Sequence, residues 1–245
     1  MLPRYYVGTS GWHYDHWRWV FYPPELPKNR WLTFYAQHFS TVELNNSFYR
    51  LPSQQAFAAW RDNTPLDFVF SVKVCRLITH LKKLRQVQEP LANLLDRASA
   101  LGDKLGPLLY QLPPNLPCNR ATLEAFVELL PKGLRHVFEF RHPSWFSHEV
   151  IGLLRRYSVG FCIMDLVGLG CPLAVTAEYA YVRFHGPAGP YWGSYSDEQL
   201  SVWKQKISSL AAEAKEVYIY FNNDMEGYAV QNARRLGEML VVGPK

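Results

Sequence analysis

The chain has 245 residues, a length that suits one domain of the barrel type, so we expect residues 1–245 to form a single domain. Its net charge of +5 comes from scattered Lys and Arg side chains, which permits nucleic acid as a partner but does not require it. No apolar run approaches the ~20 residues of a membrane helix, and residues 1–5 lack the apolar stretch of a signal peptide. We therefore expect a cytoplasmic protein with no membrane partner.

The cysteines also favour the cytoplasm. Cys75, Cys118, Cys162 and Cys171 form no C-x-x-C pair and show no zinc-site spacing. Reduced thiols are therefore expected.

Short β-rich apolar runs alternate with amphipathic stretches along the chain, which is the rhythm of βαβ units. Most runs are almost continuously apolar, as in parallel strands that are buried on both faces. The expected strands are Tyr5–Thr9, Thr41–Leu44, Phe68–Val72, Leu108–Gln111, His136–Phe140, Gly160–Met164, Tyr179–Arg183 and Glu216–Phe221.

Helical stretches separate these strands, and several begin at a residue that can cap a helix, such as Ser53, Asn119, Ser147 or Ser196. We expect helices over residues 30–39, 53–63, 91–105, 120–130, 148–157, 196–215 and 228–240. Residues 166–177 carry two glycines and a proline but no helical stripe, so the helix between strands six and seven is expected to be missing. The sequence thus predicts an α/β fold, an irregular (β/α)8 barrel of the TIM type.

Polar residues collect where each expected strand ends. In a barrel of parallel strands these ends meet at the carboxyl-terminal mouth, where loops build the active site. The segments are Gly8–Trp12, Glu43–Asn46, Lys73, Gln111–Pro114, Glu139–His142, Asp165, Arg183–Gly186 and Phe221–Asp224. We therefore expect one mouth-facing site.

The residue types suggest roles within this site. Glu43 and Glu139 are the candidate acid and base, assisted by His185 and Asp224. Lys73, Arg141 and Arg183 are cations suited to a small anionic or phosphate-bearing ligand. The remaining candidate ligand contacts are Thr9, Ser10, Trp12, Asn45, Tyr49, Gln111, Asn222 and Asn223. On this hypothesis Glu139→Gln keeps the fold and abolishes binding or turnover.

Ordered motifs run along nearly the whole chain. They are GTSGWHYDHW (8–17) with FYP (21–23), ELNNSFYRLP (43–52), FSVKVCRLITH (70–80), LLYQLPP (108–114), FEFRHPSW (138–145), YVRFHGP (181–187), YSDEQL (195–200) and YFNNDMEGYAVQNA (220–233). Together they resemble the YecE-like family, domain of unknown function 72. The resemblance implies a barrel related to the TIM fold, and it implies no particular reaction.

A metal-dependent hydrolase or isomerase of the endonuclease-IV type is an alternative. Glu43, Glu139, Asp165, His185 and Asp224 carry oxygen and nitrogen atoms that can bind a divalent cation. Only one convincing histidine follows a strand, which argues against a multi-zinc site.

Two further alternatives rest on aromatic residues, which can stack on sugars or on bases: Trp12, Trp17, Tyr49, Trp145, Tyr191 and Trp192. The first is a glycosidase with Glu43 and Glu139 as its carboxylates. The second is a module that binds nucleic acid or a nucleotide without catalysis. Structural roles are an alternative to functional ones for some residues, since Asn223 and Asp224 can cap the last helix and His185 can be a core histidine.

The sequence predicts no oligomeric state.

Overall fold

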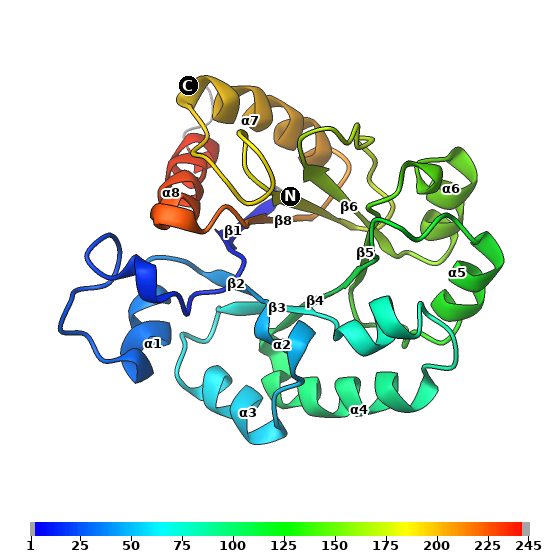
Figure 1. The fold of residues 1–245 in the computed structure, drawn as a ribbon, viewed down its shortest axis with the longest axis horizontal. Helices are drawn as coiled ribbons and strands as arrows, with labels where there is room; N and C mark the ends of the chain where they lie inside the picture. Colours follow the sequence, from blue (N-terminus) through cyan, green and yellow to red (C-terminus); the bar gives the residue numbers. More distant parts are fainter. Residues whose placement is uncertain (1–2, 242–245) are drawn as a thin grey trace.

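Eight parallel strands form one sheet that curves into a barrel (Figure 1). The structure is a computed structural model that describes residues 3–241. The strands follow each other around the sheet in the order β1-β8-β7-β6-β5-β4-β3-β2. Their bounds are β1 Arg4–Thr9, β2 Thr41–Leu44, β3 Val69–Lys73, β4 Leu105–Gln111, β5 His136–Glu139, β6 Gly160–Asp165, β7 Tyr179–Phe184 and β8 Glu216–Phe221. The predicted TIM-type barrel is confirmed. The predicted single domain extends over residues 1–2 and 242–245, which lie outside the described range, and stays a prediction.

Helices pack around the outside of the barrel, except α2, which lies at its mouth (Figure 1). The helices are α1 Trp31–Tyr35, α2 Asn46–Tyr49, α3 Gln54–Asp62, α4 Gln88–Ala98, α5 Arg120–Val127, α6 His148–Arg156, α7 Asp197–Ala211 and α8 Tyr228–Val241. Short turns of 3-10 or π type are η1 Asp15–Trp17, η2 Lys28–Arg30, η3 Leu77–Leu81, η4 Ser99–Lys104, η5 Pro143–Trp145 and η6 Met225–Gly227. No helix within residues 3–241 has the length and apolar character needed to cross a membrane.

The capping predictions agree with the structure. The side chains of Ser53, Asn119, Ser147 and Ser196 each accept a hydrogen bond from a backbone N–H in the first turn of the helix that follows. Between β6 and β7 the described chain contains no helix, as the glycines and proline of that segment predict.

Several predicted helices end earlier than expected, and two differ most. The stretch 30–39 forms only the five-residue α1 after the turn η2, and the stretch 91–105 divides into α4 and η4. Gly102 lies inside η4 with φ of 56°, a left-handed conformation that interrupts the helix. The helical spacing of apolar residues continues past Gly102 in the sequence, but the helical conformation of the backbone does not continue through it.

The barrel interior is unusually rich in tyrosine. Tyr6, Tyr179, Tyr181, Tyr218 and Tyr220 form a buried cluster separate from the larger core between strands and helices. Two of their hydroxyl groups reach polar side chains on other strands: that of Tyr220 lies 2.7 Å from Thr41 Oγ1, and that of Tyr181 lies 2.7 Å from Ser71 Oγ. The interior is therefore a hydrogen-bonded layer that can support charged groups above it.

The seam between β1 and β2 is the place where strand pairing in the barrel is least continuous. The two strands share one isolated bridge, between Ser10 and Glu43, in place of a continuous ladder. A Cβ atom on Gly8 would lie 2.3 Å from the carbonyl oxygen of Thr41, so only glycine permits this approach. The Tyr35 hydroxyl fills the gap: it accepts from the Thr9 N–H at 3.0 Å and donates to the Thr41 carbonyl at 3.0 Å.

We expect Tyr35→Phe to lower the free energy of unfolding by about 2 kcal/mol, because it leaves two buried backbone groups without a partner. Urea denaturation of the variant measures this loss. Tyr157→Phe is the control, since its hydroxyl bonds only to Glu128 at the surface. Equal stability of the two variants would contradict a structural role for the Tyr35 hydroxyl.

Candidate functional site

The alternation of side chains along each strand gathers one polar layer at the carboxyl-terminal end of the barrel. Residues two apart on a strand face the same side, so the inward positions next to each strand end form a ring. Hydrogen bonds and ion pairs join the members from β1, β2, β5 and β7, which are Ser10, Glu43, Glu139 and Arg183. All four are buried.

Arg183 is the centre of this layer. Its Nη2 donates to Glu43 Oε1 at 2.7 Å, and its Nη1 donates to Glu139 Oε2. Glu43 also accepts from the Ser10 hydroxyl at 2.5 Å and from the Tyr181 hydroxyl at 2.6 Å. The guanidinium and both carboxylates have no exposed side-chain surface.

Arg141 and His185 extend the layer toward the mouth. Arg141 Nε donates to Glu139 Oε1, and Arg141 Nη2 lies 3.0 Å from His185 Nε2. Arginine is a donor only, so His185 Nε2 acts as the acceptor and a neutral imidazole carries its proton on Nδ1. Asn222 lies 3.3 Å from that Nδ1 and satisfies it when its amide oxygen faces the ring.

The charges of this layer are fixed by their neighbours. Burial opposes ionisation of Glu139, but Arg141 and Arg183 outweigh it and hold the pKa of this carboxyl well below its usual range. Burial, followed by the nearby Arg183 charge, keeps the pKa of His185 well below its ordinary value. Glu139 is therefore a carboxylate and His185 a neutral imidazole near neutral pH.

This arrangement changes the expected roles of the two glutamates. The oxygens of both already accept hydrogen bonds from side chains of the layer, which leaves little freedom for proton transfer. Glu43 and Glu139 hold the arginines in place, so we expect Glu139→Gln to cost stability, whereas the sequence alone predicts that it keeps the fold. Removing one charge of a buried, paired set leaves its partner uncompensated.

We expect Glu139→Gln to lower the free energy of unfolding by about 3 kcal/mol, the order seen when a buried ion pair loses one member. Thermal and urea unfolding at neutral pH measure the loss. Glu178→Gln is the matched control, because Glu178 pairs with Lys215 on the surface with both side chains 75% exposed. A fully stable Glu139→Gln protein would show that the ion layer does not stabilise the fold.

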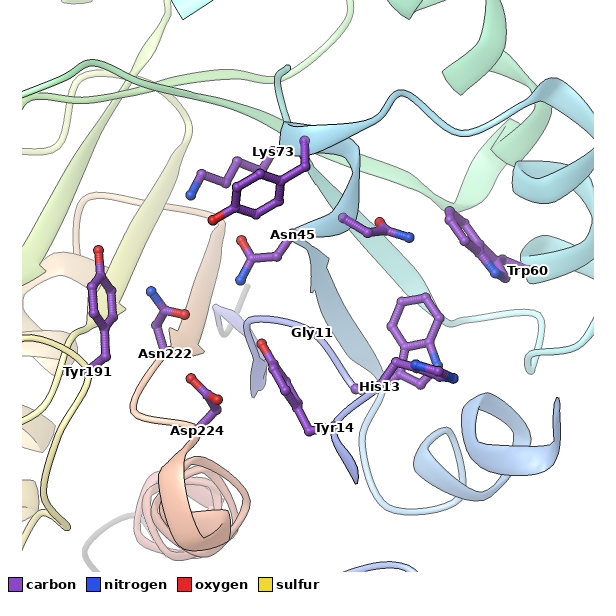
Figure 2. A pocket seen from close by; sticks show the side chains of 12 residues that line it. Gly11, His13, Tyr14, Asn45, Trp60, Lys73, Tyr191, Asn222 and Asp224 are labelled. Carbon is purple, nitrogen blue, oxygen red and sulfur yellow. The ribbon is translucent and has the colours of Figure 1, made fainter. Parts of the chain in front are cut away.

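A cavity of about 710 Å³ opens above the polar layer, at the mouth of the barrel (Figure 2). Its wall combines aromatic rings, amide groups and a few charged groups. The lining residues are Gly11, Trp12, His13, Tyr14, Asn45, Asn46, Tyr49, Trp60, Lys73, Tyr191, Asn222 and Asp224. Such a concave mixture of apolar walls and convergent polar groups is typical of a ligand site.

Lys73 reaches into the cavity from the end of β3 (Figure 2). Its Nζ lies 4.3 Å from the centre of the Phe48 ring, and no hydrogen bond from it is found within residues 3–241. Burial, reinforced by the charge of Arg183, lowers the pKa of Lys73 to about 8. A substantial fraction of this side chain is therefore a neutral amine at mildly alkaline pH.

Asp224 is the carboxyl group in the cavity lining, and Figure 2 shows it opposite Lys73 with the amides of Asn45 and Asn222 between them. Burial raises the pKa of Asp224 above its usual value. The indole N–H of buried Trp17 donates to the Asp224 backbone carbonyl at 2.8 Å and fixes this segment. The cavity thus holds a carboxyl and an amine whose pKa values are shifted toward each other.

The pKa of Lys73 makes a prediction about stability. The value is about 8 in the folded protein against 10.5 ordinarily, so between these pH values the unfolded chain binds more protons and stability rises with pH. Below pH 8 the charged amine costs stability. We expect Lys73→Met to raise the free energy of unfolding at pH 7 by about 2 kcal/mol.

That gain should shrink between pH 8 and pH 10.5, as the wild-type amine loses its charge. Urea unfolding of both proteins across this range measures it. The exposed Lys132 provides Lys132→Met as a control. A constant difference between Lys73→Met and wild type at every pH would contradict the lowered pKa.

Several predicted site residues lie apart from the cavity wall. The Thr9 side chain faces the seam and Tyr35, and Asp165 accepts from the Trp203 indole at 3.1 Å on the outside of the barrel. Asn223 donates to the Gly193 carbonyl and to Asn232, which holds the loop before α7. These contacts are structural.

Other predicted residues take intermediate positions. Gln111 is buried in the polar layer, and its Oε1 has no hydrogen-bond partner within the described chain, as is also true of Asn45 Oδ1. The Trp145 side chain is buried, and its indole N–H donates to the Leu116 carbonyl. It therefore does not present a face on which a sugar can stack.

The expected segments Gly8–Trp12 and Glu43–Asn46 supply Gly11 and Asn46 to the lining, but sequence reasoning missed His13, Tyr14 and Trp60. His13 and Tyr14 follow β1 closely, so their position after a strand was a usable signal. Trp60 lies on α3 and meets Trp12 edge-on at 5.5 Å, a contact that no local pattern indicates.

The metal alternative finds no support in the arrangement of side chains. Within residues 3–241, no three His, Cys, Asp or Glu side chains are grouped to hold a metal ion. Asp165 faces away from Glu43 and Glu139, whose oxygens are occupied by Arg183, Arg141, Ser10 and Tyr181. The candidate ligands therefore do not fit a metal centre, and we derive no reaction step from one.

The fold and the site define a TIM-type α/β barrel with a cavity at the carboxyl-terminal mouth above a buried ion layer. The chain belongs to the family described as Protein of unknown function DUF72, whose model matches residues 6–245. This confirms the resemblance found in the sequence motifs.

Named relatives and a solved structure are similar to this chain. The UPF0759 protein YunF of Bacillus subtilis is 26% identical over 269 residues, with 96% of this chain and 94% of the relative aligned. The UPF0759 protein YecE of Escherichia coli is 33% identical over 143 residues, or 58% of this chain and 50% of YecE. A DUF72 family crystal structure from Thermotoga maritima superposes with a TM-score of 0.89 at 32% identity, covering 97% of this chain and 99% of that one.

Proposed function

We propose that this protein is an enzyme that binds a small anionic substrate in the mouth cavity. The observation that carries the proposal is Lys73, a cation that faces the cavity without a hydrogen-bonding partner within the described residues. A lysine in this position is available to a ligand and has no evident structural task.

The charge around Lys73 supports an anion. In the polar layer Arg141 and Arg183 balance the carboxylates Glu43 and Glu139, and Lys73 above the layer is a further cation. His185 is neutral, so the layer and Lys73 together carry an excess of one positive charge. An enclosed positive charge attracts a carboxylate or phosphate group more strongly than an exposed one.

The cavity also holds the groups that proton transfer requires. Lys73, with its lowered pKa, can act as a base, and Asp224, with its raised pKa, can act as an acid. The aromatic rings of Trp12, Tyr49 and Tyr191 supply flat walls, and the amides of the cavity supply donors and acceptors. This division of roles supports catalysis over passive binding.

We also propose that the protein works in the cytoplasm. All four cysteines are free thiols, two of them buried, which is the state that a reducing compartment maintains.

Inorganic phosphate and a set of phosphorylated metabolites should raise the apparent melting temperature, since a ligand that binds only the folded state stabilises it. Differential scanning fluorimetry measures the shift at neutral pH. We expect Lys73→Met to lose at least about tenfold in affinity for such a ligand, because it removes a charge-assisted contact. Lys132→Met should bind as wild type does.

The same assay separates this proposal from a nucleic-acid module. A small anion in an enclosed cavity should bind with little dependence on salt, whereas an oligonucleotide should bind with a steep salt slope. Oligonucleotide binding that is steeply salt-dependent and insensitive to Lys73→Met, without any shift by small anions, would refute the enzyme proposal.

A further inference from the structure

Lys73 differs from an ordinary phosphate-binding lysine, because the carboxylates near it are already committed. Glu139 accepts from Arg141 through one oxygen and from Arg183 through the other. Glu43 accepts from Arg183, Ser10 and Tyr181. The arginines thus take up both carboxylates of the layer, and the Lys73 amine is left without a counter-ion at hydrogen-bond distance in the described structure.

Burial and like charges make Lys73 easier to deprotonate than an ordinary lysine. Burial and the charges of Arg183 and Arg141 lower its pKa, and they outweigh Glu139 and Glu43, which raise it. Desolvation and a neighbouring cation are the two ways in which proteins lower the pKa of a lysine and so activate it as a nucleophile. The amine also points into open cavity volume, where a substrate carbon can approach it (Figure 2).

We infer that Lys73 is a nucleophile that forms an imine with a carbonyl-bearing anionic substrate in the mouth cavity. This inference rests on the proposed function and names the substrate class: a small carboxylate or phosphate ester that carries an aldehyde or ketone group. It assigns Lys73 a covalent role, beyond that of a charge that holds the anion.

The covalent step balances without a cofactor. The Nζ lone pair forms a bond to the carbonyl carbon, the C=O π electrons move to oxygen, and a proton passes from nitrogen to oxygen to give a carbinolamine. A second proton, from the Asp224 carboxyl, reaches the hydroxyl oxygen as the C–O bond breaks and water leaves. The products are an iminium ion and the Asp224 carboxylate, and the reverse sequence returns the amine.

Asp224 is suited to this task by position and environment. It contributes the carboxyl group of the cavity lining, and burial favours its protonated form. The Nε2 atom of the half-exposed His16 lies 3.5 Å from Asp224 Oδ2. The pair of Lys73 and Asp224 therefore provides a nucleophile and a proton donor in one cavity.

The test is reductive trapping with glyoxylate, a small anionic aldehyde, and cyanoborohydride, which reduces the iminium to a stable secondary amine. Peptide mass spectrometry locates the modified lysine in the folded protein at pH 7. We expect Lys73 to be modified at least about tenfold faster than exposed Lys132, since a pKa near 8 leaves far more neutral amine. Asp224→Asn should slow trapping at Lys73.

Lys73→Arg is the matched variant, because it keeps the positive charge but cannot form the imine. It should retain the melting-temperature shift with inorganic phosphate and lose glyoxylate trapping at position 73. If wild type binds phosphate yet Lys73 is trapped no faster than Lys132, the imine inference is overturned and the proposed anion site stands. If neither phosphate binding nor trapping depends on position 73, both fail.

Discussion

Arg183 holds the carboxyl-terminal end of the barrel together. Its guanidinium joins Glu43 of β2 to Glu139 of β5 through the centre of the barrel, with no exposed surface on any of the three side chains. Such a set is expensive to desolvate, and it is tolerated only because hydrogen bonds from Ser10, Tyr181 and Arg141 satisfy the carboxylates. The tyrosines of the barrel interior below supply hydroxyl donors such as that of Tyr181, which aliphatic side chains could not supply. The cavity floor is thus made rigid before any ligand arrives.

The same interactions divide the polar residues into two groups with different tasks. One group, centred on Arg183, uses up its charges internally and shapes the site. The other, Lys73 and Asp224 above it, retains reactive groups that face the cavity. Leaving Lys73 unpaired sacrifices stability, as functional sites often do, whereas the two carboxylates of the layer beneath are fully paired. A candidate site chosen by residue type alone puts both groups together, because a sequence does not show which glutamate or lysine is already paired with another side chain.

The fold was accessible from the sequence because its signals are local. Apolar runs located the strands to within a few residues, capping residues located helix starts, and two glycines and a proline identified the missing helix. The position of the site at the barrel mouth followed from the parallel strands. The direction in which each side chain points depended on strand register, which the sequence does not show. Thr9 and Ser10 are adjacent, yet one faces the seam and the other the ion layer. Trp60 enters the site from a helix, and the saturation of Glu139 depends on Arg183, 44 positions away, so neither was visible in a linear pattern.

The incomplete pairing between β1 and β2 lies at one border of the cavity. Gly11 and Trp12 extend from one side of this seam and Asn45 and Asn46 from the other, and all four border the cavity. The remaining strand pairs are joined by ladders, whereas here a single bridge and the Tyr35 hydroxyl on α1 set the spacing. The width of the cavity along this border therefore depends on one bridge and one phenol instead of a strand ladder.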